Sequence, residues 1–248
     1  MSGLGTPRLH FRKTDSTNER ARQLAAGGAP HGTLVTAREQ SAGRGRQGRT
    51  WSAPAGRALL CSLVLRDPPR LLPLAGGVAV AEVASVEAAA AQVASEEAAA
   101  AEVASIEAMI KWPNDVLIGG RKLAGILVEG RPQERWAVLG IGLNVALAPD
   151  DFPPELRGQA GSLGLGEDAI EPTIERLLDA LERWLEASES DVLAAVRARD
   201  ALLGHPVRWA GGSGRGAGID GDGRLVVATE GGHIALEAGE VHLERNFG

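Results

Sequence analysis

One short segment of this chain, residues 43–51, combines three glycines with three arginines. The glycines are Gly43, Gly45 and Gly48, and the arginines are Arg44, Arg46 and Arg49. Glycine permits positive φ and close approach of a ligand to the backbone, and guanidinium groups present planar donors that match phosphate or carboxylate oxygens. No acidic residue lies between Ser41 and Arg57, although the whole chain has a formal net charge of -6. We therefore interpret residues 43–51 as an anion-binding segment, called the arginine loop below.

The arginine loop alone also fits two plainer interpretations, an exposed tether that binds RNA and a solvated turn of a surface hairpin. Three later segments favour a binding site. They are Lys111–Asp115, Arg121–Glu129 and Gly140–Val145. Lys111 and Lys122 add positive charge, and Asp115 adds a carboxylate that can hold a cation or accept a proton. This set of residues suits chemistry on a polyanion.

The composition indicates a soluble protein with a sizeable core. The 248 residues are 44% hydrophobic, which is enough for one large domain and a small one. The single cysteine, Cys61, lies in an apolar run and cannot form an internal disulfide, so we expect a reducing compartment, the cytoplasm. No signal peptide and no stretch of about 18 strongly apolar residues is recognised, so no membrane partner is expected. The acidic balance argues against bulk nucleic-acid binding.

Hydrophobic patterns and turn residues outline the elements that position these groups. We expect strands at residues 9–13, 33–37, 58–65, 109–112, 125–129 and 137–145, with a turn at 113–115. The arginine loop lies between two of these strands, where ligand-binding loops are common. Ser16 and Glu19 are spaced as a capping box and predict a helix start. A second helix is predicted over Thr173–Ala187, and Ser190 is the expected cap of the next.

From Ala81 to Ala108 the sequence repeats with a period of ten residues and is rich in alanine and glutamate, which predicts helix. Ten residues fall about 80° short of three turns, so the repeated valines cannot share one face and a coiled coil is not expected. A continuous helix would be about 42 Å long, so it should project or break near Ser95. Because the segment contains no basic residue, its glutamates predict a solvated face without chemistry.

In order and spacing, four segments resemble the catalytic domain of biotin protein ligases. They are the arginine loop, Lys111–Asp115, Lys122–Glu129 and Gly140–Val145. The likeness covers roughly residues 8–199, and the short strands separated by glycine clusters after Gly204 resemble the family's small C-terminal domain. The resemblance implies an α+β fold, with a mixed sheet flanked by helices in a catalytic domain over residues 1–203 and an SH3-like β-barrel over residues 204–248.

The resemblance implies a two-step reaction. Biotin and MgATP form biotinyl-5′-AMP and pyrophosphate, and the adenylate then acylates one lysine of a biotin carboxyl carrier domain of an acyl-CoA carboxylase. The residues agree with this on independent grounds, because joining a carboxylate to a triphosphate requires positive charge to offset anion repulsion. That charge is available from Arg44, Arg46, Arg49, Lys111 and Lys122.

Site residues are carried over from the family to the matching positions of this chain. The implied biotin-binding residues are Ser16, Thr17, Gln40, Gly43, Arg44, Arg46, Lys122 and Gly125. The implied ATP- or adenylate-binding residues are Arg46, Arg49, Trp51, Lys111, Asn114, Gly142 and Asn144. The implied catalytic residues are Arg46, Lys111, Asp115 and Lys122, with Asp115 also the candidate Mg²⁺ ligand. Arg46 is expected to close over the adenylate and slow its escape.

Several of these positions also have purely structural explanations. Ser16 is explained by helix capping alone, Lys122 by an exposed amine whose stem covers apolar surface, and Trp51 by core packing. Pro113–Asp115 also suits the end of a strand. The sequence does not separate the two roles of Asp115, metal ligand and general base.

The likeness is to family members that lack an N-terminal DNA-binding domain, because few residues precede the first predicted strand, so no DNA partner is expected. A homodimer through a sheet edge stays open, with Ala137–Val145 as the candidate edge. A lipoate-protein ligase shares the fold and chemistry, but the arginine loop and Lys111–Asp115 favour biotin. A non-catalytic biotin-binding module is the third hypothesis, and it predicts biotin binding without pyrophosphate release.

Overall fold

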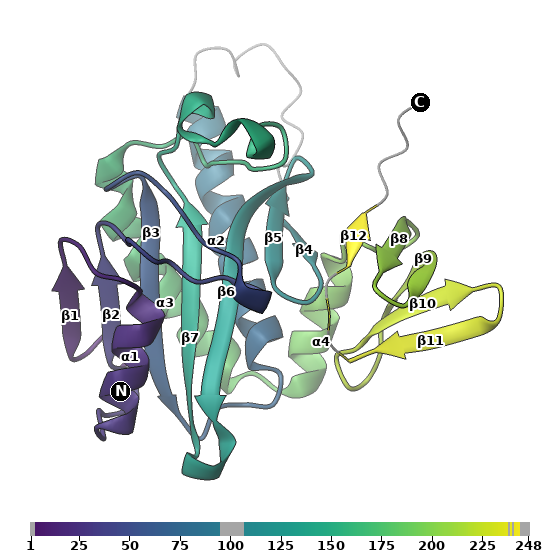
Figure 1. The fold of residues 1–248 in the computed structure, drawn as a ribbon, viewed down its shortest axis with the longest axis horizontal. Helices are drawn as coiled ribbons and strands as arrows, with labels where there is room; N and C mark the ends of the chain where they lie inside the picture. Colours follow the sequence, from purple (N-terminus) through teal and green to yellow (C-terminus); the bar gives the residue numbers. More distant parts are fainter. Residues whose placement is uncertain (1–2, 95–106, 238, 240, 244–248) are drawn as a thin grey trace.

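The computed structural model describes residues 3–94, 107–237, 239 and 241–243. A seven-stranded mixed sheet forms the main body, helices cover its two faces, and a five-stranded sheet lies beside it (Figure 1). The predicted α+β class, with a mixed sheet flanked by helices, is confirmed. A C-terminal region built of β-strands is also present.

The large sheet has the strand order β1-β2-β3-β7-β6-β5-β4, and its neighbours are antiparallel except for the parallel pair β1 and β2. The strands are β1 Arg8–Phe11, β2 Leu34–Ala37, β3 Ala58–Arg66, β4 Met109–Lys111, β5 Asp115–Ile118, β6 Arg121–Arg131 and β7 Trp136–Asn144. β3 and β7 are buried along almost their whole length. β7 lies between β3 and β6, so the prediction that residues 137–145 offer an exposed dimer edge is wrong.

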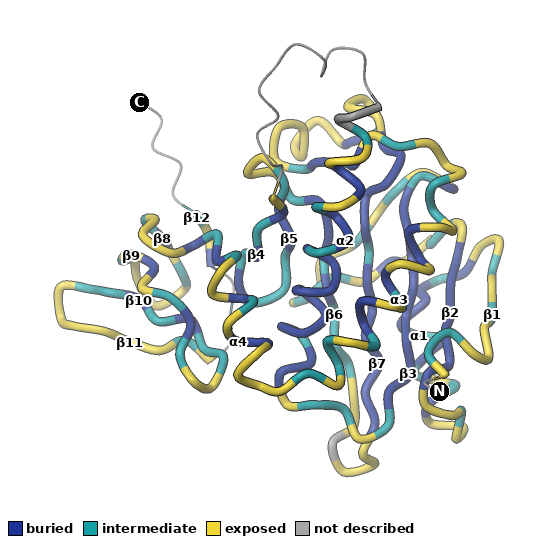
Figure 2. The backbone as a smooth tube through the Cα atoms, turned by 180° about the vertical axis from the view of Figure 1, so that it is seen from behind, coloured by how far each residue is buried: buried dark blue, intermediate teal, exposed yellow. Residues whose placement is uncertain are grey.

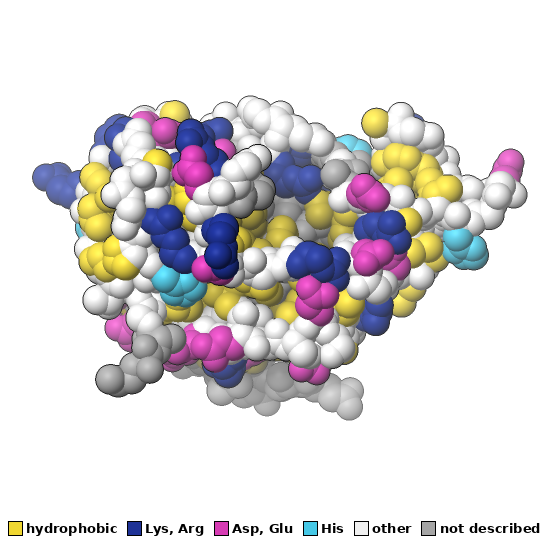
Figure 3. Space-filling model, turned by 90° about the horizontal axis from the view of Figure 1, so that it is seen from below, with side chains coloured by type: hydrophobic (Ala, Val, Ile, Leu, Met, Phe, Trp, Pro, Cys, Tyr) yellow, Lys and Arg dark blue, Asp and Glu magenta, His cyan; other side chains and the backbone are white. Residues whose placement is uncertain are grey.

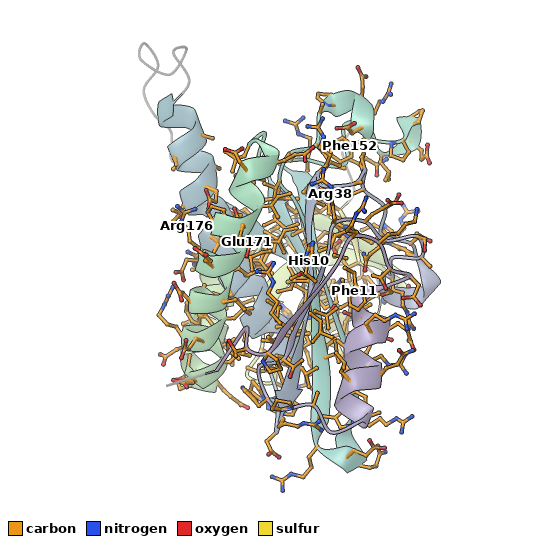
Figure 4. All side chains as sticks on the ribbon, turned by 90° about the vertical axis from the view of Figure 1, so that its left-hand side faces the viewer. His10, Phe11, Arg38, Phe152, Glu171 and Arg176 are labelled. Atoms are coloured by element: carbon orange, nitrogen blue, oxygen red, sulfur yellow. The ribbon has the colours of Figure 1, made fainter. Side chains whose placement is uncertain are left out.

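Within the described residues, three α-helices pack on this sheet, and a fourth, α4, packs on α2 and on β9 (Gly212–Ile219) of the second sheet. They are α1 Thr17–Ala26, α2 Leu72–Ala94, α3 Ile170–Glu186 and α4 Glu189–Ala198. Seen toward the β1 edge, the sheet separates α1 from α2 and α3 (Figure 4). Ala21 and Ala25 let α1 pack closely on Val35, Val64 and Val138, and the opposite face carries the main core, whose buried backbone runs through α2 and the strands (Figure 2).

The first copy of the alanine- and glutamate-rich repeat lies inside α2 and is part of the core. Ala84 and Ala88 are buried, and two glutamates bond α3: Glu87 pairs with Arg176, and Glu82 accepts a hydrogen bond from Trp184 Nε1 at 2.8 Å. The prediction of a solvated face is therefore wrong for these two residues. Their partners lie on α3, far away in sequence. Residues 95–106, with the predicted break near Ser95, lie outside the described residues.

By length and composition, α2 also qualifies as a membrane span. An 18-residue window within Leu72–Ala91 has a mean hydropathy of 1.5, and 67% of that window is buried inside the protein. The stretch contains Glu82 and Glu87, so it is not an unbroken run of strongly apolar residues. Burial against the sheet and α3 is typical of the core helix of a soluble protein, and it explains the apolar composition without a bilayer.

Two predicted helix caps differ from the structure. Ser16 is the N-cap residue of α1, but its side chain makes no capping hydrogen bond, so the predicted capping box does not form. α4 begins at Glu189 and is capped by Ser188, whose Oγ accepts from Asp191 N at 3.2 Å. Ser190 therefore lies inside the helix. The free Ser16 hydroxyl bears on the site described below.

The second sheet has the strand order β11-β10-β9-β8-β12. Its strands are β8 Pro206–Trp209, β9 Gly212–Ile219, β10 Leu225–Thr229, β11 Gly232–Leu236 and β12 His242–Leu243. β9 occupies a glycine-rich stretch that the sequence interpretation treated as a separator, so that assignment was wrong. The two sheets are joined closely, since Trp112 Nε1 donates to Gly223 O at 3.0 Å and Ala201 N donates to Ile110 O at 3.0 Å.

Candidate active site

A cleft lies over the central strands on the α1 side of the large sheet, where β6 and β7 form its floor. Its empty volume is about 910 Å³, counting the part open to solvent. The surface seen from below is hollowed between the main body and the second sheet (Figure 3). Among the predicted site residues, the following line the cleft: Ser16, Thr17, Gln40, Arg44, Arg46, Arg49, Trp51, Lys111, Asn114, Asp115, Lys122, Gly125 and Gly142.

One end of the cleft presents buried polar groups. Ser16 and Thr17 are 3% and 4% exposed, which is unusual for hydroxyl residues without a ligand or a capping role. Gln40 Oε1 accepts a hydrogen bond from Thr17 N at 2.7 Å and lies 3.1 Å from Thr17 Oγ1. The start of α1 and the start of the arginine loop are thus held together. This end can offer both donors and acceptors to a small polar ligand.

The arginine loop folds back over the cleft. Arg46–Gly48 form a short 3₁₀ turn in which Gln47 has φ 55° and Gly48 has φ 76°. Of the three glycines, only Gly48 uses the positive φ that the sequence analysis suggested. Gly43 is needed instead for close packing, since a Cβ there would lie 2.8 Å from Gln40 Nε2.

Arg46 reaches across the cleft to the opposite wall. Its Nη1 donates to Asn114 Oδ1 at 3.0 Å, and Asn114 Nδ2 donates to Ile126 O at 3.0 Å. Burial lowers the pKa of Arg46, partly offset by the charge of Asp115. The guanidinium therefore already lies in a partly desolvated position, where its charge acts strongly on an anion.

Arg44 points to carboxylates of the protein itself. Its Nη1 lies 3.1 Å from Glu19 Oε2 and its Nη2 lies 3.0 Å from Glu129 Oε1. Arg22 approaches the same two glutamates, at 3.1 and 3.7 Å. Through these ion pairs Arg44 fixes the base of the arginine loop to α1 and β6.

The other end of the cleft holds two lysines around one carboxylate. Lys122 Nζ lies 2.7 Å from Asp115 Oδ1, and Lys111 Nζ lies 4.0 Å from Asp115 Oδ2. The β4–β5 hairpin places Lys111 opposite Asp115 in register, so Asp115 begins a strand rather than lying in the predicted turn. Burial lowers the pKa of Lys111, while Asp115 opposes that shift. The arrangement keeps positive charge poised for a phosphate or carboxylate.

Trp51 covers the floor between these two ends. A Cβ on Gly142 would lie 2.5 Å from Trp51 Cε2, and one on Gly125 would lie 3.1 Å from Trp51 Cζ3. Gly125 and Gly142 are paired in register on β6 and β7, so the two glycines make room for the indole. Lys122 Nζ lies 5.8 Å from the ring centroid. Trp51 Nε1 is buried without a hydrogen-bond partner among the described residues.

Two predicted residues do not line the cleft. Asn144 is 5% exposed and donates from Nδ2 to Gly161 O at 2.9 Å, so it anchors a neighbouring loop. Gly43 packs against the backbone of the arginine loop, where a Cβ would overlap Trp51 O. Conversely, sequence analysis missed Asn18, which lines the cleft directly after Ser16 and Thr17, a position that could have suggested it.

The sequence analysis also missed a contribution from the last described residues. Gly239 and Val241 line the cleft. Burial lowers the pKa of His242, and the charges of Lys111 and Arg49 add to that effect. No motif in the sequence marks this segment, because its position depends on how the second sheet packs on β4.

The carboxylate content of the cleft limits what metal it can bind. Over residues 3–94 and 107–237, together with 239 and 241–243, no group of three His, Cys, Asp or Glu residues is placed to hold an ion. Asp115 is the carboxylate beside the lysines, and it is already paired. That set suits an ion carried mainly by phosphate oxygens, which is common for Mg²⁺.

Comparison with known proteins agrees with this geometry. The sequence model of the biotin/lipoate A/B protein ligase family matches residues 10–145. The chain belongs to this family. A biotin--[acetyl-CoA-carboxylase] ligase of Paracoccus denitrificans is 36% identical over 250 residues, which span 92% of this chain and 97% of that protein. The similarly named ligase of Mycobacterium tuberculosis is 36% identical and covered over 86% of its length.

Other relatives of this family member are larger. The bifunctional ligase/repressor BirA of Bacillus spizizenii is 43% identical over 60% of this chain. The chain spans about half the length of the curated Bacillus relatives it matches, 43% and 47%. Among solved structures, a biotin protein ligase from Aquifex aeolicus in complex with biotin and ATP has a TM-score of 0.75 and 26% identity, and the match covers 97% of this chain and 100% of that one.

Proposed function

We propose that this protein activates biotin with ATP and transfers it to a lysine of a biotin carboxyl carrier domain of an acyl-CoA carboxylase. In the first step, a biotin carboxylate oxygen attacks the α-phosphorus of ATP, and the bond from that phosphorus to pyrophosphate breaks. In the second step, the lysine amine attacks the acyl carbon, the acyl–phosphate bond breaks, and AMP leaves. The amine loses its proton to a base or to solvent.

The observation that carries this proposal is the division of the cleft into a buried polar end and a cationic end. Ser16, Thr17 and Gln40 suit the ureido ring of biotin, which has both N–H donors and a carbonyl acceptor. Lys111 and Lys122 suit the carboxylate and the phosphates that must meet each other. A ligand with a neutral polar head and an acidic tail fits this gradient.

The basic residues supply electrostatic stabilisation where negative charge gathers. Lys122 would bind the biotin carboxylate and later the acyl phosphate, and Lys111 and Arg49 would face the phosphates. Charges held in place in a partly dry site are more effective than mobile ions in water. Arg46, already held by Asn114, would close the cleft over the adenylate. Excluding water protects the mixed anhydride from hydrolysis.

The proposal includes Mg²⁺ as the partner of ATP. When bound, the ion would neutralise phosphate charge, and Asp115 is the side chain that would help to hold it. The alternative role of Asp115 is to take the proton of the incoming lysine amine. The contact of Asp115 with Lys122 supports a third contribution: Asp115 would hold the Lys122 amine in place while the cleft is empty.

A cytoplasmic location is part of the proposal. Its support is that the sequence has one cysteine, Cys61, which is buried and cannot form an internal disulfide, as expected in a reducing compartment. A carboxylase carrier domain would be met in the same compartment.

The test is incubation of the purified protein with labelled biotin, MgATP and a carrier domain, omitting each component in turn. We expect pyrophosphate release that needs biotin and ATP, and label on the carrier only in the complete mixture. A parallel reaction with lipoate separates the two branches of the family, and preference for lipoate would overturn the assignment. Biotin binding without pyrophosphate release would instead indicate a non-catalytic binding module.

A further inference from the structure

Behind the polar end of the cleft, a chain of hydrogen-bonding groups ends at Thr17. Thr17 Oγ1 lies 2.8 Å from Ser62 Oγ, and Ser62 Oγ lies 2.7 Å from Asn18 Oδ1. Ser62, on β3, is 0% exposed and is not among the residues that line the cleft. Both of its hydrogen-bond partners line the cleft, so Ser62 acts on a ligand only through Thr17 and Asn18.

The far end of this chain fixes the orientation of the Asn18 amide. Asn18 Nδ2 donates to Glu129 Oε2 at 3.0 Å and to Leu127 O at 3.4 Å. Both partners are acceptors, so the NH₂ group must face them and the amide oxygen must face Ser62. Arg44 holds the other oxygen of Glu129 at 3.0 Å. The amide lies on Gly140, where a Cβ would overlap it.

Counting protons along the chain gives it a direction. Asn18 Oδ1 has no proton, so its contact with Ser62 uses the Ser62 hydroxyl proton. Ser62 Oγ then has only lone pairs to offer, and its contact with Thr17 uses the Thr17 proton. Gln40 Oε1 is a second acceptor for the Thr17 hydroxyl proton, at 3.1 Å, and it also receives Thr17 N–H at 2.7 Å. The Thr17 oxygen is left with lone pairs for the cleft.

We propose that Ser62 and Asn18 are positioning residues that set the hydrogen-bond polarity of Thr17, so that Thr17 accepts from an N–H group of the ligand. This inference rests on the proposed function, in which the ureido ring of biotin occupies the polar end. The chain favours a cyclic urea that places an N–H donor against Thr17, and it disfavours a ligand that presents an acceptor there.

The first experiment is a double-mutant cycle on biotin binding, measured by titration calorimetry. Ser62→Ala leaves only the longer contact to Gln40 Oε1, at 3.1 Å, to hold the Thr17 proton, and we expect the Kd for biotin to rise about 3- to 10-fold, the range of one neutral hydrogen bond. Thr17→Val removes the acceptor and should raise Kd by at least as much. Because Ser62 acts through Thr17, the double variant should bind like Thr17→Val alone.

Thr36→Val is the matched control. Thr36 is a buried hydroxyl residue, 2% exposed, on neighbouring β2. Its Oγ1 contacts Arg8 and His10 and takes no part in the hydrogen bonds that link Thr17, Ser62 and Asn18. Thermal unfolding of each variant reports stability separately, and Thr36→Val should leave the biotin Kd unchanged. If Ser62→Ala does not fold, Ser62→Cys tests the same point, because a thiol is a weak hydrogen-bond partner of similar size.

The second experiment measures selectivity, which a merely structural role would not change. Biotin methylated on a ureido nitrogen lacks one N–H donor, and the bulk of the methyl group is the same for every variant. We expect the ratio of its Kd to that of biotin to fall about 3- to 10-fold in Ser62→Ala. Wild-type protein that does not bind biotin would overturn the proposed function. Wild-type binding, with additive losses in the cycle or an unchanged ratio, would overturn only the polarity inference.

Discussion

Lys122 Nζ lies 2.7 Å from Asp115 Oδ1 across the β5–β6 pair. The amine proposed to bind the biotin carboxylate is therefore held by a carboxylate of the protein when no substrate is present. The incoming acid would take over the position of Asp115 toward Lys122, so the site would bind a carboxylate by exchange instead of capturing it with a free amine.

Replacing Lys122 tests its role in the first step. Lys122→Ala should lower biotin-dependent pyrophosphate release about 100- to 1000-fold, the usual effect of losing one group that stabilises developing charge. The measurement is single-turnover pyrophosphate release at saturating ATP. Lys122→Arg keeps the charge but changes its geometry and should be impaired less. Near-normal release by Lys122→Ala would contradict the assignment.

The buried position of Lys111 predicts a pH dependence. Burial lowers its pKa below the usual 10.5, so Lys111 loses its charge as pH rises through that lowered value, and the rate of adenylate formation should fall there. Stability changes in the opposite sense: the buried charge is unfavourable, so the free energy of unfolding should rise between the folded pKa and 10.5. Lys111→Arg stays charged, and its rate should show no such decline below about pH 10.5. An identical alkaline limb in both proteins would exclude Lys111.

Arg46 is expected to control the escape of the intermediate. Arg46→Gly removes the bond to Asn114 that spans the cleft, so adenylate synthesis should stay measurable while biotinyl-5′-AMP leaks and labels bystander lysines. The readout is retention of labelled adenylate during gel filtration, together with label on an added unrelated protein. Gln47→Gly serves as a loop control that keeps the guanidinium. Retention equal to that of wild type would refute the closing role.

Gly142 should tolerate no side chain. In Gly142→Ala the new methyl group would lie 2.5 Å from Trp51 Cε2, and overpacking of this kind costs about 1–3 kcal/mol. We expect the midpoint of urea unfolding to fall accordingly. Gly221→Ala is the matched control, because a Cβ there meets nothing within 4 Å. Equal stability of the two variants would mean that Trp51 moves away easily.

Local sequence signals located the residues of the cleft but not all of their contacts. The order of strands around the arginine loop and the helix over Thr173–Ala187 follow from periodicity and turn residues, and these elements are confirmed with shifted ends. The partners of Glu82 and Glu87 could not be predicted, since they come from a helix whose packing depends on the whole core. Ser16 shows the same limit. Its spacing to Glu19 suits a helix cap, yet its hydroxyl makes no capping hydrogen bond and lies beside the cleft.

Contacts that depend on the register of strand pairing could not be predicted from the sequence either. Nothing in the chain itself shows that Gly125 and Gly142 face each other or that Trp51 lies over both, because strand pairing decides it. Arg44 was assigned to biotin from the resemblance, and the structure places it along the cleft. Its ion pairs with Glu19 and Glu129 could not be predicted, because they depend on β6 placing Glu129 beside α1.

The bond from Trp112 Nε1 to Gly223 O bears on how the protein should be handled in the laboratory. Trp112 immediately follows Lys111, so the five-stranded sheet supports the strand end that carries a cleft lysine. A truncated protein ending at residue 203 would leave Trp112 Nε1 without its acceptor, Gly223 O. It would also expose the apolar residues around this indole. Experiments on residues 1–203 alone would therefore measure a protein whose cleft has lost part of its support. The intact polypeptide should be expressed instead.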